Sequence, residues 1–130
     1  MSVILDSGFI CAYRNMQDKN HDTAIQIVGE IDRDIFGTMY ISDYLFDETL
    51  TLLRTRIGID EARKTGNIIL QTLHFIKIDD LIFEDALKKF QKYNVSFTDC
   101  TTLSLMKYIG IEYLATFDGD FKGLVKTLGV

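Results

Sequence analysis

Short apolar runs alternate along the chain with longer stretches in which apolar residues recur every three or four positions. Runs rich in β-branched and aromatic residues are typical of strands, and the longer spacing is typical of amphipathic helices. The runs predict strands at 2–5, 39–41, 74–78 and 111–117, with a small edge strand at 128–130. The spacing predicts helices at 9–14, from 20 or 22 to about 31, 46–57, 61–73, from 79 or 80 to 90, 98–110, and a short one near 121.

Polar residues and glycines mark the expected ends of these elements. Ser7 and Gly8 are expected to turn the chain after the first strand, and Gly58 and Gly110 to end helices. The expected helix caps are Asp60, Asp79 or Asp80, and Thr98. Strands separated by helices predict an α/β sandwich with a parallel sheet and right-handed crossovers.

Four acidic residues, far apart in the chain, lie at the end of an apolar stretch or inside one: Asp6, Glu48, Asp99 and Asp118. Asp6 and Asp118 follow predicted strands, and open parallel sheets bind ligands beyond the carboxyl ends of their strands. Asp99 falls in the first turn of a predicted helix, where an ionised carboxylate is favoured. Glu48 shares a helical face with leucines. These positions predict one acidic site at one end of the sheet, gathered around one or two divalent cations.

Each acid also has a purely structural interpretation. Asp6 could cap the helix that follows it, Asp99 could serve only the first helical turn, and Asp118 and Asp120 could form a plain turn. Glu48 is the hardest to explain in this way, because burying a carboxylate without a partner costs several kcal/mol or forces it to protonate.

Composition narrows the function classes. The chain has 130 residues, 47% of them hydrophobic and 25% charged, as in a globular domain. We expect a single domain over residues 1–130. No apolar run approaches the ~20 residues that cross a bilayer, and no basic segment opens the chain, so we expect a soluble, cytoplasmic protein. Cys11 and Cys100 are expected to be free thiols.

The net charge of −5 is unusual for a protein that binds nucleic acid, because such proteins usually carry a basic surface. Two divalent cations in the acidic site would raise this formal charge from −5 to −1. An acidic chain is therefore compatible with a nucleic-acid substrate if its acidity is concentrated in a metal site. Lys122 and Lys126, one helical turn apart, could contact a substrate phosphate or could belong to a solvated face.

Four segments, taken in order, resemble the PIN domain, a family of metal-dependent nucleases: Ile4–Ser7, Ile41–Ser42 with Glu48 and Leu52–Leu53, Thr98–Cys100, and Leu114–Phe121. The resemblance implies a three-layer α/β/α sandwich with a central, mainly parallel sheet of four or five strands. It also implies a pocket that binds Mg²⁺ or Mn²⁺, one or two ions per site. By matching position, Asp6, Glu48, Asp99 and Asp118 would be the acidic quartet and Asp120 an auxiliary acid, with Ser7, Thr98 and Thr116 as supporting hydroxyls.

Small members of this kind look like VapC-type toxins, ribonucleases that tend to form homodimers and are inhibited by a small antitoxin. The resemblance therefore implies a metal-dependent endoribonuclease with RNA as substrate. One departure is Cys100-Thr101-Thr102, where the family often has small apolar residues. The alternatives are a PIN-like module that binds RNA or protein without cutting, and a PIN nuclease of RNA processing. Asp118-Gly119-Asp120 imitates the Asp-x-Asp motif of haloacid-dehalogenase-type phosphatases, but only ten residues follow it.

Overall fold

The computed structural model describes residues 1–33 and 37–130. Its elements follow the predicted alternation of strands and helices, and none of the described helices is long and apolar enough to span a membrane. In chain order they are β1 (Ser2–Leu5), α1 (Ser7–Arg14), α2 (His21–Arg33), β2 (Thr38–Ser42), α3 (Asp43–Ile57), α4 (Ile59–Thr72), β3 (His74–Ile76), α5 (Asp80–Phe90), α6 (Phe97–Ile109), β4 (Tyr113–Ala115), the 3-10 turn η1 (Gly119–Phe121) and β5 (Thr127–Leu128).

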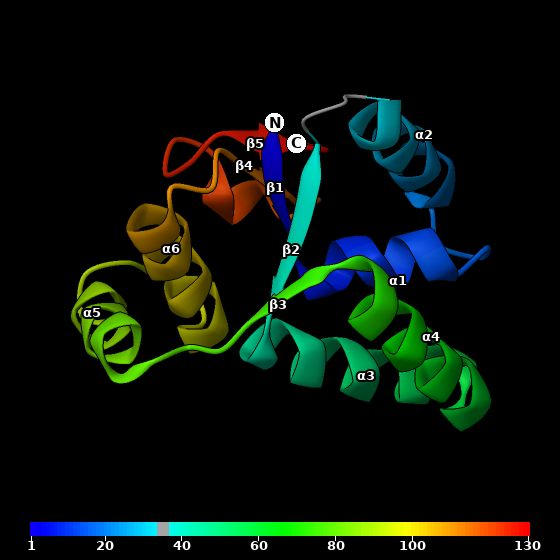
Figure 1. The fold of residues 1–130 in the computed structure, drawn as a ribbon, viewed down its shortest axis with the longest axis horizontal. Helices are drawn as coiled ribbons and strands as arrows, with labels where there is room; N and C mark the ends of the chain where they lie inside the picture. The colour runs from blue at the N-terminus through cyan, green and yellow to red at the C-terminus, as the bar shows by residue number, and fades with distance from the viewer. Residues whose placement is uncertain (34–36) are drawn as a thin grey trace.

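The strands form one five-stranded sheet in the order β3-β2-β1-β4-β5. Every neighbouring pair is parallel. Figure 1 shows α5 and α6 on one side of the sheet, α1, α2 and α4 on the other, and α3 across the ends of the strands. The predicted α/β sandwich with a mainly parallel sheet is therefore confirmed. The strand order reverses between β1 and β4, which is where open sheets of this kind bind ligands.

The core is built around the central strand. Val3, Ile4 and Leu5 are all buried, as expected for a parallel strand that is covered on both faces. Helix α6 is buried along its whole middle, from Cys100 to Met106. The hydroxyls of Thr101 and Thr102 donate to the carbonyl of Thr98 at 2.6 and 3.1 Å, so these polar residues pack there without an unpaired donor. Both cysteines are buried free thiols, as predicted.

Four predicted helix starts are wrong. Helix α3 begins at Asp43, after its cap Ser42, rather than at residue 46. Helix α1 begins at Ser7, because Asp6 accepts a hydrogen bond from the Phe9 amide at 2.7 Å and caps it directly. Helix α4 begins at Ile59 rather than after Asp60, because Gly58, at a φ of 106°, ends α3 and starts α4 without a loop between them. Helix α6 begins at Phe97 and is capped by Ser96, not by Thr98.

The spacing of Phe83, Ala86, Leu87 and Phe90 predicts one apolar face on α5, and this prediction is only partly right. Ala86 is buried and so is Ile82, whereas Phe83, Leu87 and Phe90 are each more than a third exposed. Helix α5 packs against α6 at the outside of the molecule, so only a narrow strip of its surface is covered (Figure 1). On α6, the apolar spacing predicts that Tyr108 is buried together with Leu103 and Met106, but Tyr108 is 52% exposed.

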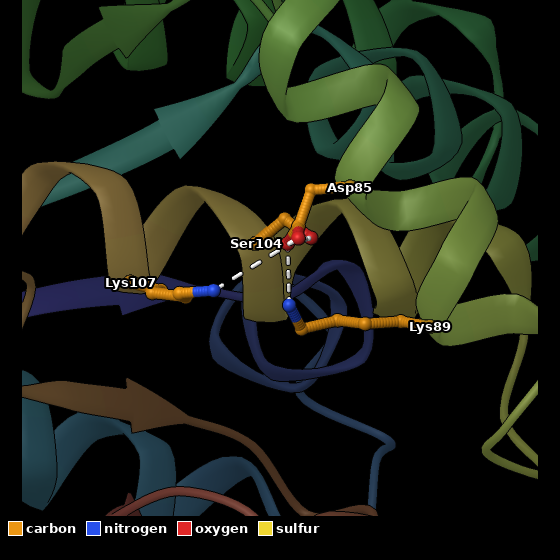
Figure 2. Close-up of polar contacts among 4 residues, drawn as sticks. All are labelled: Asp85, Lys89, Ser104 and Lys107. Atoms are coloured by element: carbon orange, nitrogen blue, oxygen red, sulfur yellow. Dashed lines mark hydrogen bonds and ion pairs between the residues drawn. The ribbon is translucent and has the colours of Figure 1, made fainter.

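A polar cluster joins α5 to α6 (Figure 2). The buried hydroxyl of Ser104 donates to Asp85 at 2.7 Å, and the ammonium group of Lys89 forms an ion pair with the same carboxylate. The ammonium nitrogen of Lys107 lies 3.9 Å from the other carboxylate oxygen of Asp85. Hydrogen bonds from Lys89 and then Ser104 hold the pKa of Asp85 below its usual value. Asp85 thus stabilises the helix pair that carries Asp99.

We expect Asp85→Ala to lower the free energy of unfolding by about 1–3 kcal/mol, because it leaves the buried Ser104 hydroxyl unpaired. Urea unfolding measures this. Glu84→Ala, at the exposed neighbouring position, is the control and is expected to stay within about 0.5 kcal/mol of wild type. Equal midpoints for Asp85→Ala and wild type would contradict a stabilising role for the cluster.

Candidate active site

The site lies at the carboxyl ends of β1 and β4, the pair at which the strand order reverses. Asp6 follows β1, and its amide donates to the carbonyl of Ala115, the last residue of β4, at 3.2 Å. Just beyond, the rings of Phe9 and Phe117 stack with their centroids 5.4 Å apart. These contacts bring the chain after β1 beside the chain after β4.

An open hollow of about 480 Å³ occupies this end of the sheet. All four acids predicted from the sequence line it, and each comes from a different part of the fold. Asp6 follows β1, Glu48 lies on α3, Asp99 lies in the first turn of α6, and Asp118 follows β4. The structure therefore brings the four carboxylates to one place, and their chemical role stays a prediction.

Asp6 is the most buried of the four, with 8% of its surface exposed. Burial raises its pKa from 3.8 to about 6, and the charges of Asp99 and Asp118 act in the same direction. Hydrogen bonds from the Thr116 hydroxyl and the Phe9 amide partly oppose this rise in pKa. Keeping the buried Asp6 carboxylate ionised beside other negative charges therefore costs free energy. Such strongly shifted acids are common at functional sites.

Two of the three predicted supporting hydroxyls contact the acids. Ser7 donates a hydrogen bond to Oε1 of Glu48, which ties α1 to α3. The fully buried Thr116 donates to Asp6 and accepts from the Asp118 amide at 3.0 Å. Thr98 differs, because it lines a neighbouring hollow that also contains Glu48.

The structural interpretations of the aspartates also hold. Asp6 caps α1, Asp99 forms a capping box with Ser96, and Asp118 accepts from the Asp120 amide at 2.9 Å. Burial nevertheless raises the pKa of Asp99, against hydrogen bonds from Ser96, and the charges of Asp118 and Glu48 raise it further. A carboxylate offers about four acceptor positions, so capping leaves oxygen lone pairs for a ligand.

Besides Thr98 and Thr116, three charged residues of the predicted site do not line the hollow: Asp120, Lys122 and Lys126. Asp120 lies within η1 and Lys122 directly follows it, and both residues are exposed. Lys126 lies at the opposite end of β4, where its carbonyl accepts from Leu114 and its ammonium lies 5.9 Å from the Tyr113 ring centroid. The chain must return to that end because β5 pairs parallel to β4. Lys126 therefore does not line the hollow, and its contact with a substrate phosphate stays a prediction.

The hollow also contains residues that sequence reasoning missed: Asp18, Asn20, Arg56 and Ser96. Asp18 and Asn20 belong to the α1–α2 connection, where the Asn20 amide donates to Asp18 at 2.8 Å. Arg56 lies on α3, and its spacing of eight residues from Glu48 was the one signal that could have placed it on the same helical face.

The donor set fits a divalent cation of the Mg²⁺ or Mn²⁺ type. Its side-chain donors are carboxylate oxygens, which such ions prefer, with no thiol or imidazole among them. In the described part of the chain, no three Asp, Glu, His or Cys side chains are already close enough to share one ion. Mg²⁺ does not need that arrangement, because it keeps several waters and binds through one or two carboxylates.

Comparison with known proteins gives relatives along nearly the whole chain. A VapC ribonuclease of Archaeoglobus fulgidus is 23% identical over 125 residues, covering 93% of this chain and 80% of the relative. The 23S rRNA-specific endonuclease VapC20 of Mycobacterium tuberculosis is 28% identical over 123 residues, covering 92% and 91%.

Solved structures agree with these relatives. The crystal structure of M. tuberculosis VapC20, described as a sarcin-ricin loop cleaving toxin, superimposes with a TM-score of 0.83 at 27% identity, covering 92% of both chains. A toxin–antitoxin complex from Klebsiella pneumoniae, at 20% identity and a TM-score of 0.73, shares the fold.

The PIN domain description matches residues 3–126. The resemblance predicted from the ordered acidic segments is thereby confirmed. PIN nucleases generally use a divalent metal, which agrees with the all-oxygen donor set of the hollow. The chain belongs to the PIN domain family.

Proposed function

We propose that this chain is an endoribonuclease that hydrolyses RNA phosphodiester bonds at the acidic hollow, with Mg²⁺ or Mn²⁺ as cofactor. The observation that carries the proposal is the convergence of Asp6, Glu48, Asp99 and Asp118 at the reversal point of the sheet. The relatives named as ribonucleases support RNA as the substrate. Residues 1–130 would act as one catalytic domain in the cytoplasm.

Each acid has a distinct part in this proposal. Asp6 and Asp99 would hold the cation, and Asp118 would hold a second ion or its water shell. A bound cation would polarise the phosphate and lower the pKa of a water molecule. Glu48, which accepts a hydrogen bond from Ser7, would orient the attacking water as a ligand or as an acceptor, and Thr116 holds Asp6 in place. The water oxygen would bond to phosphorus as the P–O3′ bond breaks, and the 3′ oxygen would take up the proton that the water gives up. The products are then a 5′-phosphate and a 3′-hydroxyl.

We expect Mn²⁺ to raise the thermal midpoint of the wild-type protein, because an ion that binds only the native state stabilises it by about 2.7 kcal/mol at a hundred times its Kd. Differential scanning fluorimetry across a Mn²⁺ series measures the shift. Asp99→Asn is expected to shift much less at each concentration. An unchanged wild-type midpoint would count against a metal site.

The biological role we favour is that of a toxin held inactive by a small antitoxin. Structural neighbours include toxin–antitoxin complexes, and a groove between α1, α2 and α4 fits a protein partner. Its walls are mainly apolar, and they include the half-exposed Ile68. Two buried polar atoms at this groove, Arg14 Nε and Thr65 Oγ1, have no hydrogen-bond partner in the described residues. An antitoxin segment with apolar side chains and free carbonyls would satisfy both features.

We expect Ile68→Asp to weaken antitoxin binding at least roughly a hundredfold, because a carboxylate buried in an apolar groove costs several kcal/mol. Cleavage by the free protein should not change. Calorimetry with the product of the adjacent reading frame measures binding. Ile25→Asp on α2, exposed and outside the groove, is the control. Equal affinity of the Ile68 variant and wild type would exclude the groove as the binding site.

We also propose a homodimer. Apolar side chains on the outer side of α5 support a further interface, since Leu81 is 66% exposed and Phe90 is 47% exposed. Light scattering tests this oligomeric state.

The rival interpretation of the chain is a PIN-like module that binds without cutting, and the presence of all four acids in one hollow argues against it. A PIN nuclease of RNA processing differs from a toxin mainly in lacking an antitoxin.

A further inference from the structure

The acidic hollow contains a single cationic side chain among the described residues that line it. Five carboxylates face it, those of Asp6, Asp18, Glu48, Asp99 and Asp118, and the one positive group is Arg56. An RNA strand carries a negative charge at every phosphate, so this surface repels it except at a bound cation and at Arg56. The position of Arg56 therefore bears on how a strand could enter the hollow.

Arg56 is not committed to another partner. The ion pairs of the described residues use Arg14, Lys89 and Lys107, and no hydrogen bond involves the Arg56 side chain. The residue is exposed. Its guanidinium therefore offers all five of its donors to a ligand, in the fork geometry that binds phosphate oxygens in pairs. Had Arg56 served only to neutralise the acids, it would lie within ion-pair distance of one of them.

The helical spacing sets the distance from the reacting centre. Glu48, Leu52 and Arg56 follow one another at intervals of four residues on α3, and all three line the hollow. At a rise of about 1.5 Å per residue, the Cα atoms of Glu48 and Arg56 lie about 12 Å apart along the helix axis. Arg56 forms no ion pair with Glu48, and Leu52 lies between them with apolar surface, so Arg56 is placed to bind a phosphate next to the one at Glu48.

We propose that Arg56 binds a phosphate flanking the one that is cleaved, so that the RNA strand runs along α3 across the hollow. This inference rests on the proposed ribonuclease function and adds a substrate-binding residue to it. Arg56 takes the part that the sequence suggested for Lys122 and Lys126, neither of which lines the hollow. Leu52 contacts the ribose or base between the two phosphates.

The test is the kinetics of Arg56→Gln on a single-stranded RNA at several salt concentrations. We expect KM to rise roughly tenfold with little change in kcat, because binding to a flanking phosphate is the same in the ground state and the transition state. The slope of log kcat/KM against log salt should become shallower by about 0.7, the value for one phosphate contact on a single strand. Arg56→Lys keeps the charge, so it should keep the salt slope and give an intermediate KM.

Arg54→Gln is the matched control, because Arg54 is an exposed arginine on the same helix that does not line the hollow. It should keep the wild-type KM and salt slope. A wild-type KM and slope for Arg56→Gln, or equal changes in both variants, would overturn the inference. Both results leave the ribonuclease proposal standing, since that depends on metal-dependent cleavage by the wild type. If Arg56→Gln failed to fold, a wild-type KM for Arg56→Lys would overturn the inference equally.

Discussion

Asp6→Asn is expected to reduce RNA cleavage by more than about a hundredfold while the fold remains intact. Asparagine keeps the shape of the side chain, and its oxygen can still accept the Phe9 amide that caps α1. It lacks the negative charge needed to hold a divalent cation beside Asp99. Loss of residues that only support a metal ligand typically costs 10–100-fold in affinity or activity, so loss of a ligand should cost more.

The measurement is the initial rate of cleavage of single-stranded and of structured RNA in saturating Mn²⁺. Circular dichroism checks that the variant is folded. Asp22→Asn is the control, because Asp22 is an exposed acid in the first turn of α2 and lies outside the hollow. Its rate should equal that of wild type. Cleavage by Asp6→Asn at the wild-type rate would remove Asp6 from the site.

The same substitution is expected to make the metal-free protein more stable at pH 7. Burial raises the pKa of Asp6 from 3.8 to about 6 in the folded state. Between these two values the native state binds more protons than the unfolded state, so stability falls as the pH rises from about 4 to 6. Above that window the ionised carboxylate costs up to about 3 kcal/mol, which asparagine does not incur.

Urea unfolding with a chelator at pH 7 and near pH 4 measures this difference. Asp6→Asn should unfold at higher urea than wild type at pH 7, and the two should converge near pH 4. Adding Mn²⁺ at pH 7 should then stabilise wild type more than the variant. A less stable variant at pH 7 would mean that the Asp6 carboxylate stabilises the fold as a helix cap. It would contradict the expectation that the ionised carboxylate destabilises the folded state.

The meeting of the four acids in one hollow could be predicted from the sequence because two of its signals are local. Val3, Ile4 and Leu5 form a β-branched and apolar run that ends at Asp6, and the general topology of parallel sheets predicts a ligand at such an end. Glu48 shares a helical face with leucines, so its side chain had to lie against the rest of the fold. These two features needed no knowledge of tertiary contacts.

The remaining features depend on contacts between distant segments. The pattern of α5 predicted a buried phenylalanine face, but the neighbours of α5 leave most of that face open. Lys126 was assigned to the site from its closeness to Asp118 in sequence, and the pairing of β5 with β4 carries it to the opposite end. Arg56 became a candidate only once the face of α3 toward the hollow was known. Ser96 as the cap of α6, and the start of α4 directly after Gly58, were missed because several adjacent residues could each have begun the helix.

The ends of the RNA fragments test most directly whether a carboxylate-held cation directs water to the phosphate. Wild-type protein is incubated with RNA in Mn²⁺, in Mg²⁺ and after chelation, and the fragments are analysed by mass spectrometry. The expected result is cleavage only with a divalent cation, giving 5′-phosphate and 3′-hydroxyl ends. Cleavage that persists in chelator, or fragments that end in 2′,3′-cyclic phosphate, would contradict a metal-dependent hydrolytic site at Asp6, Glu48, Asp99 and Asp118.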